Sequence, residues 1–130
     1  MWLRTTSSET GKAPDADDAA QPAPLRIDVT PDATRFVVAL HGECDLAGAP
    51  AMKAAFDRAL ASGAPEVVVD LGPCVFADST AMAALVGLNR RIAVAGGRSL
   101  LILPGPPVVQ RVFALCGLLD ILPFRFPEAS

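Results

Sequence analysis

The sequence from Val67 to Leu88 reads V-V-V-D-L-G-P-C-V-F-A-D-S-T-A-M-A-A-L-V-G-L. Its first part, Glu66 to Leu71, is a β-branched run typical of a central strand that is covered on both faces. A short apolar piece, Cys74 to Ala77, then leads into Asp78-Ser79-Thr80. These three residue types often cap the free amides of a first helical turn, so a helix is expected to follow. Strand, connection and helix in this order indicate one unit of an α/β fold.

The chain before this stretch predicts a hairpin and a helix. Leu25 to Val29 alternates apolar and polar residues, Thr30-Pro31-Asp32 is a turn signal, and Arg35 to His41 is a second apolar strand that ends at Gly42. Pro50 suits the first turn of a helix that Gly63 would end. The apolar face of that helix is formed by Met52, Ala55, Phe56, Ala59 and Leu60.

The chain after this stretch continues the alternation. The helix that follows Thr80 has Met82, Leu85, Val86 and Ile92 on its inner face and closes at Gly96-Gly97. Ser99 to Leu103 predicts a buried strand, and Leu119 to Phe124 a last short strand. Between them Pro106-Pro107 opens a third helix, which Gly117 ends; its expected inward residues are Val108, Val109, Val112, Phe113 and Cys116. The order β-β-α-β-α-β-α-β predicts an α/β fold, a mostly parallel sheet with helices packed against it and an N-terminal antiparallel hairpin.

Residues 1–24 differ in composition from the rest of the chain. They are rich in Ala, Pro, Asp, Ser and Thr and have almost no large apolar side chain after Leu3. Such a segment buries too little surface to offset its ordering entropy, which predicts a mobile tail before a single domain at residues 25–126. The tail would be a solvated extension or a docking arm for a partner. Apolar runs too short to span a bilayer, and no apolar leader, favour a cytoplasmic protein without a membrane partner.

Several functional classes find no support in the sequence. The net charge is −3 and no basic stripe is present, which disfavours nucleic acid as a partner. Cys44, Cys74 and Cys116 are far apart, and His41 has no partner at ligand spacing, so we expect free, mostly buried thiols and no metal. No catalytic triad motif or phosphate-binding glycine loop occurs. We therefore expect no cofactor and no enzyme; a small enzyme or nucleotide-binding protein would show saturable binding of ATP or GTP.

Ser79 has two interpretations from the residues alone. The first is ordinary helix capping by the Asp78-Ser79-Thr80 segment. The second is a switch, in which an exposed serine at the end of the sheet is phosphorylated beside the positive helix terminus. The domain would tolerate that phosphate, whereas a partner docked over the helix would meet about −1.5 to −2 of new charge.

The motif V-V-V-D-L-G-P-C-V-F-A-D-S-T resembles the signature of STAS domains, in which an apolar strand ending in D-L precedes D-S-[ST]-G and a helix. Gly42-Glu43-Cys44-Asp45 is similar to the G-E-x-D of the family's second strand. The segment from Pro107 to Phe113 with Cys116-Gly117-Leu118 is similar to its third helix and exit. The resemblance covers Leu25 to Phe124; it departs at Ala81, where the family has glycine.

The resemblance implies an anti-sigma factor antagonist. Such a protein, when unphosphorylated, binds an anti-sigma factor of the histidine-kinase-like ATPase fold and frees the sigma factor. The kinase then phosphorylates the serine, here Ser79, and a phosphatase resets the cycle. Asp78 would orient the hydroxyl, and the docking surface would include Asp45, Thr80 and Met82. The alternative within the family is a phosphorylation-independent regulatory subunit of an ABC-type lipid transport ATPase.

Overall fold

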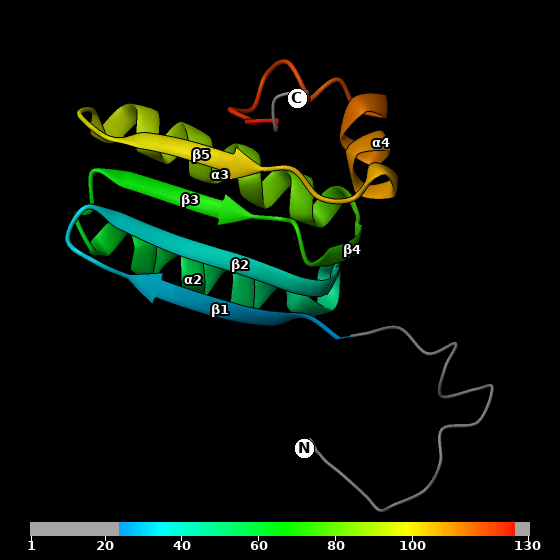
Figure 1. Cartoon of the computed structure of the whole chain (residues 1–130), viewed down its shortest axis with the longest axis horizontal. Helices are drawn as coiled ribbons and strands as arrows, with labels where there is room; N and C mark the ends of the chain where they lie inside the picture. The colour runs from blue at the N-terminus through cyan, green and yellow to red at the C-terminus, as the bar shows by residue number, and fades with distance from the viewer. Residues whose placement is uncertain (1–23, 127–130) are drawn as a thin grey trace, which may run out of the picture.

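The computed structural model describes residues 24–126, which form a sheet with two long helices beside it and a third at its end (Figure 1). Residues 1–23, and with them almost all of the expected tail, lie outside the described part. The sheet has the order β1-β2-β3-β5, and β4 pairs with the end of β2. Its strands are β1 (Arg26–Pro31), β2 (Arg35–Cys44), β3 (Glu66–Asp70), β4 (Cys74–Ala77) and β5 (Ser99–Leu103). The helices are the short 3-10 turn η1 (Leu46–Gly48), α2 (Ala49–Ala61), α3 (Ser79–Ala95) and α4 (Pro107–Leu115).

The predicted hairpin and parallel sheet are confirmed. β1 runs antiparallel to β2, with Arg26 opposite His41, while β2, β3 and β5 run parallel. Two helical crossovers connect the parallel strands, which places the carboxyl ends of β2, β3 and β5 at one end of the sheet. In Figure 1 this is the right-hand end, where β4 and α4 also lie.

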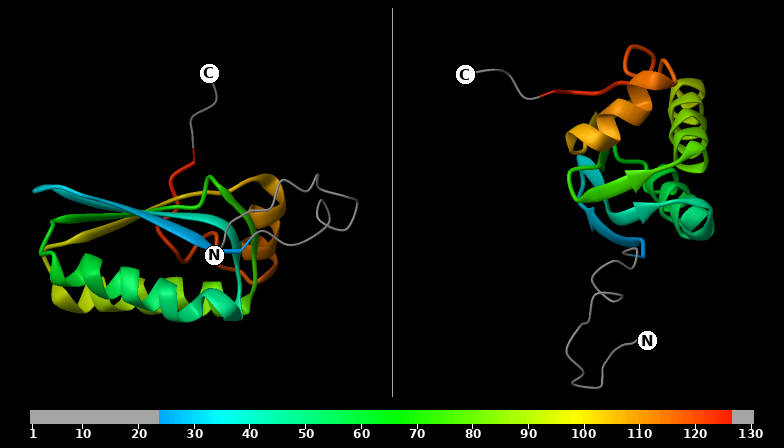
Figure 2. Two further views of the ribbon diagram at one scale, coloured as in Figure 1. Left: turned by 90° about the horizontal axis from the view of Figure 1, so that it is seen from below. Right: turned by 90° about the vertical axis from the view of Figure 1, so that its right-hand side faces the viewer.

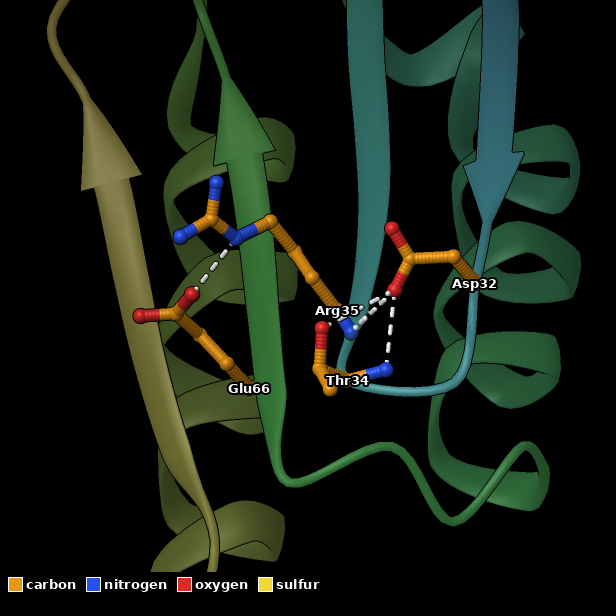
Figure 3. A network of polar contacts seen from close by, with 4 residues as sticks. All are labelled: Asp32, Thr34, Arg35 and Glu66. Carbon is orange, nitrogen blue, oxygen red and sulfur yellow. Dashed lines mark hydrogen bonds and ion pairs between the residues drawn. The ribbon is translucent and has the colours of Figure 1, made fainter.

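The turn of the hairpin is held by a polar network around Asp32 (Figure 3). Asp32 Oδ1 accepts hydrogen bonds from the backbone N–H of Thr34 and of Arg35, both at 2.8 Å, and from the Thr34 hydroxyl at 3.2 Å. Those two N–H groups lower the pKa of the Asp32 carboxyl. Arg35 Nε in turn donates to Glu66 Oε1 at 2.6 Å, which joins the start of β2 to the start of β3.

The core lies between the sheet and the pair α2 and α3, which occupy the same face (Figure 2). Val67 and Val69 of β3 belong to this core with Phe56, Leu85 and Leu88 from the helices. Val68 is also buried, at 4% exposure, although it lies outside that cluster and points to the opposite face. The two long helices therefore cover one face of β3, while Val68 is buried on the other, so the strand is buried on both faces as the β-branched run predicts.

Four details of the sequence prediction need correction. β2 continues past Gly42 to Cys44, because Gly42 takes a φ of 89° at a bulge that lets the strand pair with β4. Leu119 to Phe124 is not a strand: the N–H groups of Ile121 and Leu122 donate to Leu118 O, and a single parallel bridge links Phe124 to Ile102.

Two residues of α4 and its end differ in burial from the sequence prediction. Val108, expected inward, is 56% exposed, and Cys116 is exposed at the end of α4 rather than buried.

Candidate functional site

Asp78 fixes where α3 begins. Its backbone is extended, and its Oδ1 accepts hydrogen bonds from the backbone N–H of Thr80 at 2.9 Å and of Ala81 at 3.3 Å. The Met82 N–H then donates to Asp78 O at 3.1 Å, the first regular bond of the helix. Asp78 is thus the N-cap, and its contacts with the backbone account for an aspartate at this position. Among the described residues, the hydrogen bonds of its carboxylate go to these amides and not to the Ser79 hydroxyl.

Ser79 is the first residue of α3 and is exposed. Thr80 beside it is half-buried. The connection from β4 to α3 thus presents the Ser79 side chain at the end of the sheet, where solvent or a protein partner can reach it. The exposed position that the switch hypothesis needs is therefore present at Ser79.

Met82 lies elsewhere. It is 7% exposed and belongs to the hydrophobic core together with Leu85, one turn further along α3. Residues three or four positions apart in a helix lie on the same face. Met82 therefore shares the inner face of α3 with Leu85 and points toward the sheet. Its side chain therefore offers almost no surface for docking, although the family resemblance placed Met82 on the docking surface.

Ala81, where the STAS motif has glycine, is also buried, at 2% exposure, within the core. Its methyl group therefore packs toward the interior of the domain. A glycine would matter on the outer surface only if a partner approached the backbone there. The alanine does not obstruct the exposed side of the α3 start.

The Gly42–Asp45 and Asp78–Thr80 segments meet at this end of the sheet. The Asp78 N–H donates to Cys44 O at 3.2 Å, and Cys44 pairs with Ala77 in the β2–β4 ladder. Asp45 follows Cys44 directly and is half-buried. The two motifs, which are 33 residues apart in the sequence, therefore form one surface, on which Ser79 is exposed and Asp45 is half-buried.

The surroundings of this surface are acidic and apolar. Glu43 and Asp45 line a hollow of about 330 Å³ between the end of β2 and the start of α2. Exposed apolar side chains lie on the neighbouring segments: Leu46 is 71% exposed, Val75 52% and Phe76 43%. Exposed apolar side chains that lie next to a few charged groups are typical of a protein-binding surface.

Beneath this surface lie the thiols of Cys44 and Cys74, both fully buried, with their sulfur atoms 3.4 Å apart. The contact with Cys74, together with burial and the nearby carboxylates of Asp45 and Asp78, raises the pKa of the Cys44 thiol. Cys44 therefore stays protonated at neutral pH and acts as a packing residue. Within residues 24–126, no group of three or more His, Cys, Asp or Glu side chains has the arrangement of a metal site.

The family described as "Mlab, STAS domain" matches residues 26–123, which includes all the strands and helices above. The chain belongs to the STAS domain family. The comparison with curated proteins finds no match. In the described part of this STAS domain, no helix has the length and apolar character needed to cross a bilayer.

Solved structures share the fold. An anti-sigma factor antagonist from Mycobacterium paratuberculosis superposes with a TM-score of 0.72 at 24% identity, over 81% of this chain and 87% of that one. SpoIIAA in its unphosphorylated form gives a TM-score of 0.65 at 18% identity, over 81% and 89%. The Bacillus cell fate determinant SpoIIAA in the phosphorylated form gives 0.58 at 21% identity, over 81% and 92%. At these identities the likeness establishes the fold of the STAS domain.

Proposed function

We propose that this STAS domain is an anti-sigma factor antagonist whose binding is switched by phosphorylation at Ser79. The observation that carries the proposal is the placement of Ser79: an exposed hydroxyl on the first residue of α3, directly after an aspartate that caps the helix. In its unphosphorylated form the protein binds an anti-sigma factor of the histidine-kinase-like ATPase fold, and the sigma factor is released. The protein itself is a substrate and not an enzyme.

The electrostatics of the site support a switch by added charge. The end of the sheet already carries the carboxylates of Glu43, Asp45 and Asp78. A phosphate on Ser79 adds about −1.5 to −2 at neutral pH, so a partner that approaches this surface meets a much larger negative charge. The Thr80 and Ala81 amides are already occupied by Asp78. The phosphate is therefore only partly compensated by the helix terminus, and its added charge remains at the surface where a partner would dock.

The core is shielded from the same modification. Ser79 lies at the surface, while the next inward residues of α3, Ala81 and Met82, are the ones that pack against the sheet. A phosphate on Ser79 changes no buried contact of the core, so it alters the docking surface without unfolding the domain. A phosphatase that removes it restores the binding form.

Solved structures with the same fold support this proposal. They include anti-sigma factor antagonists, and SpoIIAA is recorded in both unphosphorylated and phosphorylated forms. The description of the matched family names Mlab and not an anti-sigma factor antagonist. That name keeps a second function open, a phosphorylation-independent regulatory subunit of an ABC-type lipid transport ATPase.

Phosphosite mapping tests the modification directly. We expect mass spectrometry of the protein isolated from its native host to find a phosphate on Ser79 in a fraction of the molecules, and none on Thr80. A protein that carries no phosphate at Ser79 in any growth condition would contradict the switch and favour the phosphorylation-independent function.

A further inference from the structure

A groove of about 380 Å³ lies between α2 and α3, and its exposed lining residues, Lys53, Ala83 and Arg91, show that it opens to solvent. The two helices lie side by side there (Figure 2). The floor of the groove is formed by Phe56 and Leu88, which are 3% and 2% exposed. Ala84 and Gly87 are among its small lining residues, and their size is what leaves the space open. A volume near 300–1,000 Å³ with mainly apolar walls is typical of small-molecule sites.

Two cations line the groove. They are Lys53 and Arg91, and their side chains are 75% and 53% exposed. Both contact Asp57: Lys53 Nζ lies 2.9 Å from Asp57 Oδ2, and Arg91 Nη1 lies 2.9 Å from Asp57 Oδ1. The two cations therefore converge on one carboxylate, that of Asp57.

Neither cation is saturated by Asp57. Each is shown donating one hydrogen bond to it, whereas an ammonium has three donors and a guanidinium five. The unused donors belong to exposed side chains, so a second anion can reach them from solvent. Arg58 and Arg90 also lie on these helices, and Asp57 is the one acidic residue in either of them. The helix pair is thus a basic surface on a chain whose net charge is −3.

We propose that the α2–α3 groove binds a small anionic amphiphile, a medium-chain aliphatic carboxylate whose tail lies over Phe56, Gly87 and Leu88 and whose carboxylate contacts Lys53 and Arg91. The apolar floor provides burial for the tail. The two cations provide charge-assisted hydrogen bonds for the head group. This proposal does not depend on the switch at Ser79, which is at the opposite end of α3 from Arg91.

Three variants separate the elements of the proposed site. Gly87→Leu is designed to fill the groove, and its first side-chain atom enters open space, because a Cβ at Gly87 meets nothing within 4 Å. Arg91→Gln removes one head-group contact. Arg90→Gln is the matched control: it removes the same charge from the same helix, at a residue that does not line the groove.

The experiment is a titration of the full-length protein with decanoate, followed by amide chemical shifts in two-dimensional NMR. We expect saturable shifts at Gly87 and its neighbours, loss of binding in Gly87→Leu, and about fivefold weaker binding in Arg91→Gln but not in Arg90→Gln. Asp57→Asn removes the competing carboxylate and is expected to bind about threefold more tightly. Decyltrimethylammonium, which has the same tail with the opposite charge, is expected to bind much more weakly. Absence of saturable shifts at Gly87, equal binding of the two amphiphiles, or unchanged binding in Gly87→Leu would overturn the proposal.

Discussion

Asp78 Oδ1 and the Thr80 backbone nitrogen lie 2.9 Å apart, across a hydrogen bond that determines the start of α3 and the position of Ser79. The same aspartate donates its own N–H to Cys44 O at the end of β2. One residue therefore connects the helix cap to the sheet edge. The exposed serine gains a fixed position while its own side chain remains available to solvent.

The capping role of Asp78 is measurable. Asp78→Ala removes the acceptor for two amides and is expected to lower the free energy of unfolding by about 1 kcal/mol. Asp78→Asn keeps a side-chain oxygen and is expected to retain most of that stability. Urea denaturation compares them, with Ser79→Ala as the control, for which we expect a change within about 0.5 kcal/mol. Equal stability of the alanine and asparagine variants would show that the cap contributes nothing.

Alanine substitutions at Gly105 and at Gly87 are expected to change the free energy of unfolding in opposite directions. A Cβ at Gly105 would lie 2.8 Å from Leu71 O and 3.1 Å from Val109 Cβ, so Gly105→Ala must displace backbone or core atoms. We expect it to lower the free energy of unfolding by about 1–3 kcal/mol. Gly87→Ala meets nothing within 4 Å inside a helix and is expected to raise it by up to about 1 kcal/mol. Thermal unfolding of both variants checks the prediction, which fails if the two shift in the same direction.

Arg98 lies far from α2 in the sequence, but its side chain binds carbonyl groups at and just after the end of that helix. Its guanidinium donates to the carbonyl oxygens of Ala59, Leu60 and Ala64, each at 2.9 Å. We expect Arg98→Ala to lower the free energy of unfolding by about 1–3 kcal/mol, because carbonyls at a helix end lose charged donors. Arg98→Lys should recover only part, since one ammonium cannot reproduce the planar fork. Arg90→Ala, on the exposed side of α3, is the control; a loss equal to that of Arg98→Ala would contradict the assignment.

Acid is expected to weaken the hairpin turn through Asp32. The N–H groups of Thr34 and Arg35 lower its pKa below the ordinary 3.8, so its contribution to stability is complete above that value. The contribution is lost as the pH falls through the lower folded-state pKa. The pKa of the Asp57 carboxyl is also lowered, mostly by the hydrogen bond from Lys53 and next by that from Arg91, so Asp57 adds to the loss of stability in acid. Melting temperatures measured between about pH 2 and 6 should fall less steeply for Asp32→Asn than for the unmodified protein; identical slopes would exclude Asp32 as a source.

The sequence predicts the sheet and its helices well because both have strong local signals. The β-branched run of β3 and the proline and glycine at the ends of α2 and α4 are readable without the fold. The end of the chain is different: the apolar residues from Leu119 to Phe124 look like a strand, but Pro123 has no N–H and the turn bonds to Leu118 compete with pairing. Periodicity also places Met82 correctly in the core, which argues against the docking role that the family resemblance suggested for it.

The candidate site could be predicted only in part. The D-S-T motif and G-E-C-D motif are visible in the sequence, and the hydrogen bond between Asp78 and Cys44 shows that they meet. The groove between α2 and α3 could not be predicted, because it depends on small residues of two helices facing the same side. The convergence of Lys53 and Arg91 on Asp57 likewise joins residues 34 positions apart. Such contacts come from the packing of the helices and have no local sequence signal.

The most direct test of the proposed switch is affinity capture from the native host with Ser79→Ala and Ser79→Asp proteins as baits, followed by mass spectrometry of the bound proteins. Both variants should have the unfolding temperature of the unmodified protein, which is the control for folding. We predict that Ser79→Ala retains an anti-sigma factor of the histidine-kinase-like ATPase fold and that Ser79→Asp loses it. Recovery of the same partners with both baits, or of an ABC-type transport ATPase, would contradict the switch.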